Sequence, residues 1–178
     1  MKKIISFLLI ATSLCVLLSS CSGYNKIMRD HLSDAANYQD YTVTLVDMYY
    51  KDTSNGETRR DFDNQDFVDY DVNISVTFET VEQVSAFLGG SPNKNKPLED
   101  YKFSLVIHAA NNRILFENGF YENIAVGNKI NIIASDWIYM DGNFFYVAQV
   151  ECDGVVYLYF EDGLKNITDR MDENKSLL

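Results

Sequence analysis

Hydrophobic and polar residues alternate most regularly between positions 70 and 79. The apolar members of this series are Tyr70, Val72, Ile74, Val76 and Phe78. A period of two predicts a strand with one face in the core and the other in water. Thr80 and Gln83 follow with the spacing of a capping box, and Gly89-Gly90 ends the apolar stripe behind them. We therefore expect a short helix between this box and the glycine pair.

Less regular patterns predict strands before and after this unit. Residues 41–50 are rich in Thr, Val and Tyr, and Asn55-Gly56 behind them suits a tight turn. Residues 101–109 alternate again. Asn111-Asn112 then predicts a turn into a partner strand over residues 113–117.

Two Asp-Gly pairs mark the last third of the chain as a meander. We expect its strands over residues 129–140, 143–152 and 155–160. Asp141-Gly142 and Asp153-Gly154 supply the tight turns between them. Helices are expected at both ends of the body. The first carries an apolar stripe over residues 24–36, and the second covers residues 164–171.

The order of these elements predicts a mainly β (α+β) domain with an N-terminal helix and one short internal helix. This order, with a late strand entered through Gly127-Asn128-Lys129, resembles an oligonucleotide/oligosaccharide-binding (OB) fold, a small Greek-key barrel. The resemblance is one of pattern and not of motif. An immunoglobulin-like β-sandwich also has short alternating strands and is the alternative. We expect one domain over residues 24–170 and a polar tail over residues 171–178.

The first 21 residues carry a separate signal. A basic start, Met1-Lys2-Lys3, precedes a mostly apolar run over residues 4–18, which suits a secretory signal peptide (residues 1–20) and is too short to span a bilayer. The run ends in Leu18-Ser19-Ser20-Cys21, which resembles the lipobox of bacterial lipoproteins. The resemblance implies cleavage before Cys21 and a diacylglyceryl group on its thiol. Residues 21–23 would then tether the body to the extracytoplasmic face of a cell membrane, because two acyl chains anchor a protein stably.

The charge of the chain limits its partners. The sequence has a net charge of −11, which becomes −13 when Lys2 and Lys3 leave with the leader. Proteins that bind nucleic acid use clustered Lys and Arg. The body has no such cluster, so nucleic acid is not an expected partner. We expect the membrane, through the lipid on Cys21, and a surface protein or a glycan. No cofactor motif is present, and no cofactor is expected.

A polar segment over residues 57–69 offers the one metal hypothesis. Asp61, Asp63, Asp66 and Asp69 are weak candidates for a calcium site, although Asp66 stands where an EF-hand needs a glycine. A solvated acidic loop accounts for the same residues, so we predict no metal site.

The remaining titratable residues give no catalytic signal. His31 and His108 lie on different predicted elements and do not have the short spacing of zinc ligands. His108 follows the polar side of its strand and is expected at the surface. Cys152 is the one cysteine of the body after Cys21, so no disulfide framework is possible there. Its acidic neighbours raise the pKa of a thiol, and we expect a small buried residue.

Large aromatic residues gather on both sides of the Asp141-Gly142 turn. Strict alternation fails here, which predicts that some aromatic surface reaches solvent. The candidate binding residues are Asp136, Trp137, Tyr139 and Phe145. Exposed aromatics beside a carboxylate suit stacking on sugar rings or anchoring of a protein partner. A hairpin covered by a terminal helix is the alternative.

Two functions from different classes follow. The first is a non-catalytic, membrane-anchored binding or interaction module, and the alternative is an exported hydrolase with a carboxylate site. A concave pocket holding two carboxyl groups of raised pKa would favour the hydrolase. An aromatic patch without such a pocket would favour the binding module.

Overall fold

The alternating segment forms a strand at the centre of a sheet. In the computed structural model, which describes residues 26–63, 65–88, 90–135 and 145–173, this strand is β3 (Val72–Phe78). Its apolar side chains are buried and the polar ones between them are partly exposed. β3 pairs antiparallel with β1 (Tyr38–Lys51) and β4 (Lys102–Ile107). The prediction of a strand buried on one face is therefore confirmed.

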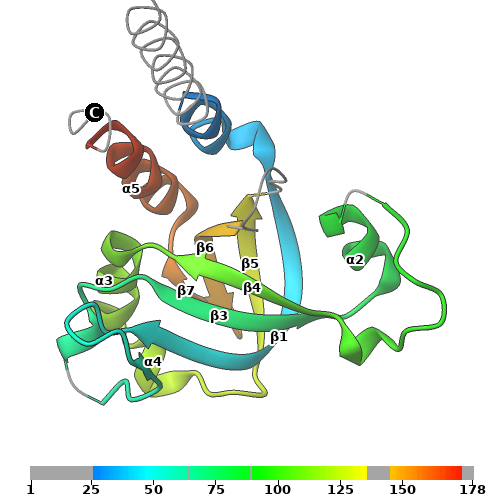
Figure 1. Ribbon diagram of the computed structural model, residues 1–178, viewed down its shortest axis with the longest axis horizontal. Helices are drawn as coiled ribbons and strands as arrows, with labels where there is room; N and C mark the ends of the chain where they lie inside the picture. The colour runs from blue at the N-terminus through cyan, green and yellow to red at the C-terminus, as the bar shows by residue number, and fades with distance from the viewer. Residues whose placement is uncertain (1–25, 64, 89, 136–144, 174–178) are drawn as a thin grey trace, which may run out of the picture.

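Seven strands join into one sheet (Figure 1). The other four are β2 (Thr58–Arg59), β5 (Lys129–Ser135), β6 (Phe145–Cys152) and β7 (Val155–Leu158). The strand order is β2-β1-β3-β4-β6-β5, and β7 pairs with β6. Because β1 also pairs with β5, the hydrogen-bonded path runs from β1 through β3, β4, β6 and β5 and returns to β1. β4 and β6 are parallel, and the other pairs are antiparallel.

Helices lie at both ends of this sheet (Figure 1). α2 (Val81–Leu88) lies at one end, α3 (Ala109–Glu117) and α4 (Phe120–Asn123) lie at the other, and all three contribute side chains to the same core cluster. Three single-turn 3₁₀ helices, η1 (Ala35–Asn37), η2 (Gln65–Phe67) and η3 (Leu98–Asp100), lie in the connections. The capping box of α2 forms, since the backbone N–H of Gln83 donates to the hydroxyl of Thr80 at 3.2 Å.

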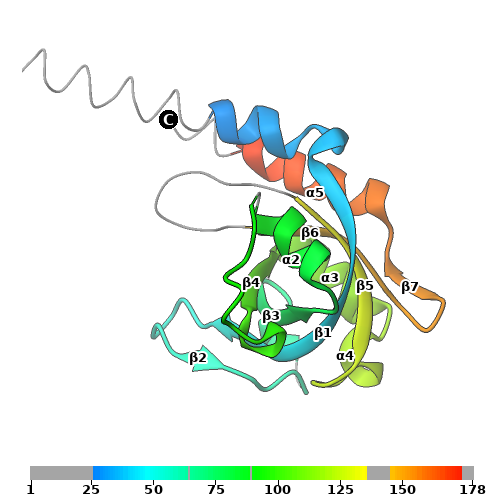
Figure 2. The same cartoon turned by 90° about the vertical axis from the view of Figure 1, so that its right-hand side faces the viewer.

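The two ends of the described chain pack together (Figure 2). Residues 26–32 are helical and lie alongside α5 (Phe160–Glu173). Leu32 and Ile167 are buried in one cluster with β6 side chains between the helices and the sheet. Arg29 of the first helix lies 3.9 Å from the carboxylate of Asp172. Both terminal helices were expected, although α5 is longer than predicted.

The prediction of a turn and a strand over residues 111–117 is wrong, because this segment is α3. Its Asn111 and Asn112 side chains are fully buried and donate hydrogen bonds to carbonyl groups of other elements. They therefore do not act as turn residues. With α3, α4 and α5 the chain is a mixed α+β protein around one sheet, richer in helix than predicted. One continuous sheet also differs from the two separate sheets of the immunoglobulin-like alternative.

The second Asp-Gly turn has the backbone that its sequence predicts. Asp153 and Gly154 have φ angles of 51° and 78°, as a two-residue hairpin turn of type I′ requires. The turn joins β6 to β7. The other predicted turn, Asp141-Gly142, lies outside the described residues. No helix in the described part of the chain is both long and apolar enough to cross a membrane.

Candidate functional site

A groove lies between α2 and the connection that leads from α2 to β4. Its volume is about 650 Å³, within the range that small-molecule sites occupy. Apolar side chains and two lysines line it together. The lining residues are Val81, Glu82, Ser85, Ala86, Gly90, Ser91, Pro92, Asn93, Lys94, Lys96, Leu98 and Tyr101.

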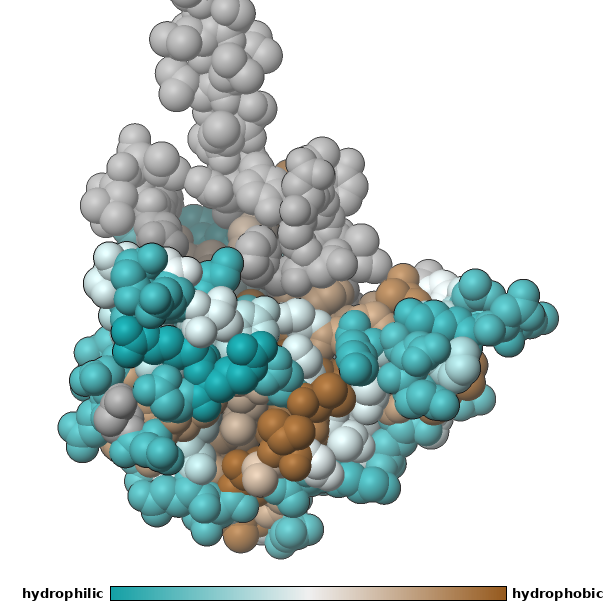
Figure 3. Space-filling view, turned by 60° about the horizontal axis from the view of Figure 1, so that its bottom comes forward, coloured by the Kyte–Doolittle hydropathy of each residue, from teal (hydrophilic) through white to brown (hydrophobic). Residues whose placement is uncertain are grey.

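The helix wall of the groove is fixed by one buried ring. Phe87 points from α2 into the core, with ring centroids 4.9 Å from Phe103 and 4.0 Å from Phe145. Because Phe87 anchors one face of α2, the other face is turned away from the sheet. Two large apolar side chains of α2 reach solvent there, Val81 at 53% and Leu88 at 41% exposure. Figure 3 shows hydrophobic side chains on one face of the molecule, in a strip between polar regions.

The loop wall of the groove is held by Tyr101. Its hydroxyl accepts a hydrogen bond from the backbone N–H of Asn93 at 2.6 Å and donates one to the carbonyl of the same residue at 3.2 Å. Its ring stacks on Phe103 with a centroid distance of 6.3 Å. The Nζ atom of Lys96 lies 4.3 Å from the centroid of the Tyr101 ring. One tyrosine thus fixes the loop and positions one of the two lysines.

The lysines of the groove differ from most other cations of the protein. Seven described cations lie within 4 Å of a carboxylate, namely Arg29, Arg59, Arg60, Arg113, Lys129, Lys165 and Arg170. Lys94 and Lys96 have no carboxylate partner in the part of the chain that the structure describes. The groove therefore presents two lysines outside the described ion pairs, beside the one carboxylate of Glu82, in a protein of net charge −11.

The aromatic site expected around residues 136–145 is only partly described. Asp136, Trp137 and Tyr139 lie outside the described residues, as does the lipidation candidate Cys21. Phe145 is only 5% exposed and packs against Phe87 of α2. It is a core residue and does not belong to an exposed binding surface.

The acidic residues proposed as weak metal candidates do not form a site. Asp61 accepts a hydrogen bond from the hydroxyl of Tyr50 at 3.3 Å, and Asp69 pairs with Arg113 of α3. No group of three or more His, Cys, Asp or Glu that could hold a metal occurs among the described residues. Asp61 and Asp69 are thus used in contacts within the protein.

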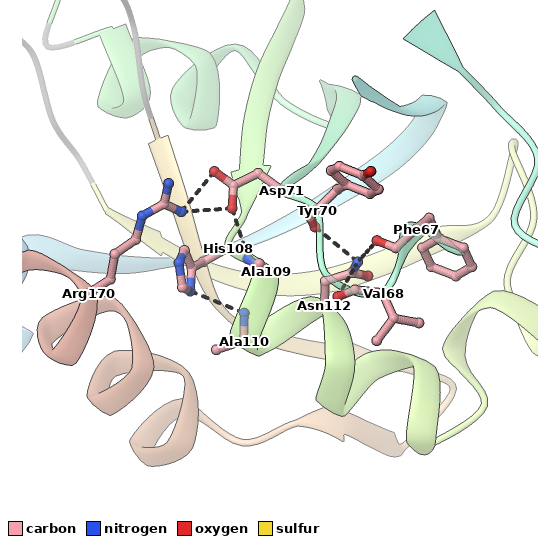
Figure 4. Close-up of polar contacts among 9 residues, drawn as sticks. All are labelled: Phe67, Val68, Tyr70, Asp71, His108, Ala109, Ala110, Asn112 and Arg170. Carbon is pink, nitrogen blue, oxygen red and sulfur yellow. Dashed lines mark hydrogen bonds and ion pairs between the residues drawn. The ribbon is translucent and has the colours of Figure 1, made fainter. Parts of the chain in front are cut away.

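His108 is buried, with 8% exposure, so the prediction of a surface histidine is wrong. It is the N-cap of α3, and its Nδ1 atom accepts a hydrogen bond from the backbone N–H of Ala110 at 3.3 Å (Figure 4). Burial, and then the charge of Arg170, lower its pKa. Because Nδ1 accepts a hydrogen bond, the neutral ring carries its proton on Nε2. His108 is therefore placed to cap a helix and not to act as a general base.

An ion pair between Arg170 and Asp71 lies beside His108 (Figure 4). Arg170 of α5 donates from Nη1 to both carboxylate oxygens of Asp71, at 2.7 and 2.8 Å (Figure 4). Asp71 also accepts the backbone N–H of Ala109 at 2.9 Å. These bonds tie the start of β3 to α3 and α5. The hydrogen bonds of this cluster that the structure describes are made within the protein, which indicates a structural role.

Asn112 joins α3 to the connection before β3. Its Nδ2 atom donates to the carbonyls of Phe67, Val68 and Tyr70 at 2.9 to 3.3 Å (Figure 4). Its Oδ1 atom accepts a hydrogen bond from the hydroxyl of Tyr121 at 2.6 Å. One fully buried amide therefore contacts three carbonyl groups of an irregular segment.

Cys152 is buried, as expected. Its thiol contacts the carbonyl of Lys129 at 3.2 Å. Burial raises the pKa of this thiol, and the neighbouring carboxylates of Asp153 and Glu151 raise it further. This is the environment of an inert structural cysteine.

Sequence reasoning missed the groove because its residues lie in a connection that was predicted only as a loop. The available signal was local charge. Lys94, Lys96 and Lys102 lie close together in an otherwise acidic chain, and Pro92 and Pro97 flank the first two. Nothing in this pattern indicates that α2 stands opposite the loop.

The fold and the groove together define an α+β protein whose single sheet has an open groove beside it, lined by apolar side chains and two lysines. Comparison of the chain with models of protein families, with curated proteins and with solved structures gave no match. Proposals about function therefore rest on the sequence and on the structure itself.

Proposed function

We propose that this chain is a lipoprotein, anchored through Cys21 on the extracytoplasmic face of a bacterial cell membrane, whose body binds a ligand without catalysing a reaction. The observation that carries the binding role is the groove beside α2, whose two lysines have no carboxylate partner among the residues described. The lipobox Leu18-Ser19-Ser20-Cys21 carries the anchoring role. The lipid is then the link to the membrane, and the further partner is a surface protein or a glycan.

The packing of the first helix supports a short tether. Only four residues separate Cys21 from Lys26, the first residue that the structure describes. Residues 26–32 are already helical and contact α5. A body that begins so soon after the lipid would be held close to the bilayer surface and not on a long stalk.

We further propose that the sheet is an OB-like barrel. The closed path from β1 through β3, β4, β6 and β5 back to β1 supports this, as does the parallel pairing of β4 with β6. OB folds bind oligosaccharides or oligonucleotides. The negative charge of the chain argues against an oligonucleotide.

The alternative of an exported hydrolase with a carboxylate site finds less support. The groove is lined by one carboxylate, that of Glu82, beside two lysines. Glycosidase-type chemistry needs two carboxyl groups on either side of the bond that is cleaved. Among the described residues, Asp47 and Asp52 have a carboxyl pKa below its usual value and not the raised pKa of a general acid. The first cause is the hydrogen bond from Arg60 in Asp47 and the hydrogen bond from the Ser54 side chain in Asp52.

Labelling of cells with an alkyne-bearing fatty acid tests the anchor. The wild-type chain and the Cys152→Ser control should incorporate the label, whereas Cys21→Ser should not. The two cysteines make a matched pair, because they are the cysteines that remain after cleavage before Cys21. Equal labelling of Cys21→Ser, or an unlabelled wild type, would overturn the anchoring role.

A further inference from the structure

We infer that the groove beside α2 binds an organic anion, a molecule with a carboxylate or phosphate head group and an apolar body. This inference rests on the proposed binding function and names the ligand class of the same site.

Charge is the first argument. Lys94 and Lys96 line the groove and have no carboxylate partner among the described residues, whereas seven other cations do. With Glu82 as the single lining carboxylate, the groove carries a local excess of positive charge. A protein of net charge −11 repels anions elsewhere on its surface. An acidic group is therefore attracted to this part of the molecule more than to other parts.

The remaining lining residues select an apolar body. Val81, Ala86, Pro92 and Leu98 supply apolar contacts, and the volume of about 650 Å³ suits a small organic molecule. A purely inorganic anion would leave this apolar surface in contact with water. The combination of lysines and apolar walls thus matches a ligand that carries both parts.

The position of Lys96 indicates how the head group is bound. Its ammonium lies over the ring of Tyr101, an interaction that is weak at an exposed site. A charge-assisted hydrogen bond to a carboxylate or phosphate is stronger. Lys96 is exposed, so it can turn from the ring to the ligand while the hydroxyl of Tyr101 continues to hold the loop through Asn93.

Such an anion has two possible sources, a dissolved metabolite and a membrane lipid, which share the same chemistry. The test uses the lipidated full chain in phosphatidylcholine nanodiscs. One arm adds a diazirine-bearing octanoic acid, with the corresponding octanol as the neutral control. A second arm places a diazirine-bearing phosphatidylglycerol in the disc. After irradiation, mass spectrometry locates the labelled residues.

We expect the acid or the anionic lipid to label residues 81–101, and the octanol to label them about tenfold less. Lys94→Gln/Lys96→Gln should lower labelling by the anion to the level of the octanol. Lys51→Gln, at an exposed lysine outside the groove, should leave it unchanged. Labelling by the acid would indicate a dissolved ligand, and labelling by the lipid a membrane source; either supports the inference.

Two results would overturn the inference, and only the second would also refute the proposed binding function of the groove. Equal labelling by acid and octanol, unaffected by the double lysine variant, would refute the anionic ligand but leave the groove as a binding site. Absence of labelling within residues 81–101 by any probe would also refute the groove as the binding site in the proposed function.

Discussion

Gly163 gives the most direct test of how α5 lies on the sheet. It is buried in the first turn of α5, where a Cβ atom would overlap the carbonyl oxygen of Ala148 in β6 and lie 2.7 Å from its carbonyl carbon. The backbones of the helix and the strand are therefore in direct contact. A side chain at this position would force α5 away from β6.

Gly163→Ala should destabilise the protein although alanine is the better helix former. Overpacking against a rigid backbone costs about 3 kcal/mol, at the upper end of the usual range, because neither element can move alone. The helix propensity of alanine returns about 1 kcal/mol. The expected net loss is about 2 kcal/mol, which corresponds to a fall in Tm of about 4–8 °C for a domain of this size.

Urea unfolding followed by circular dichroism, on the chain from Ser22 onward, measures this loss. Gly90→Ala is the matched control, since a Cβ atom there meets nothing within 4 Å. The control should change the free energy of unfolding by less than about 0.5 kcal/mol. A Gly163→Ala protein as stable as the wild type would show that α5 does not contact β6 in this way.

Three further predictions concern buried polar groups. Asn112→Ala should lower the free energy of unfolding by about 3 kcal/mol in urea titrations, because it removes the buried hydrogen bonds to three carbonyls and from the Tyr121 hydroxyl. A loss below about 1 kcal/mol would contradict these contacts. His108 has a pKa below its ordinary 6.5 in the folded protein, so the unfolded chain binds the proton first as pH falls. The free energy of unfolding should therefore decrease from pH 6.5 downward through the lowered pKa. Unfolding curves at pH 7.5 and 5.5 should show a smaller decrease for His108→Asn than for the wild type. If the free energy of unfolding depended on pH equally in both proteins, His108 would not be the group responsible. The Cys152 thiol should react with Ellman's reagent only after unfolding, and rapid reaction of the native protein would show that it is accessible.

The elements that could be predicted from the sequence are those whose signal is local. β3 follows from strict alternation, α2 from the Thr80 and Gln83 capping box, and the β6–β7 turn from Asp153-Gly154. In each case the residues that give the signal also make the contacts that form the element.

α3 could not be predicted because its buried face is polar. Asn111, Asn112 and Leu115 point inward, so the hydrophobic period of a helix is absent, and an Asn-Asn pair is typical of turns. The partners of these amides are carbonyl groups more than 30 residues away in sequence. The burial of His108 has the same cause, because it follows from the helix that His108 caps.

Long-range pairing limited the prediction of the sheet and of the groove. The last third of the chain predicts a simple meander, yet β6 pairs in parallel with β4 as well as antiparallel with β5. That pairing brings Phe145 against Phe87 and buries a residue expected at the surface. The groove likewise depends on the placement of α2 opposite its own following loop, which no local pattern specifies.

The central claim, that this is a lipid-anchored body, is tested most directly at the amino terminus of protein isolated from cell membranes. Mass spectrometry of the amino-terminal peptide should find a chain that begins at Cys21 and carries a diacylglyceryl group on its thiol. A chain that still carries residues 1–20, or that begins at an unmodified Cys21, would contradict the claim.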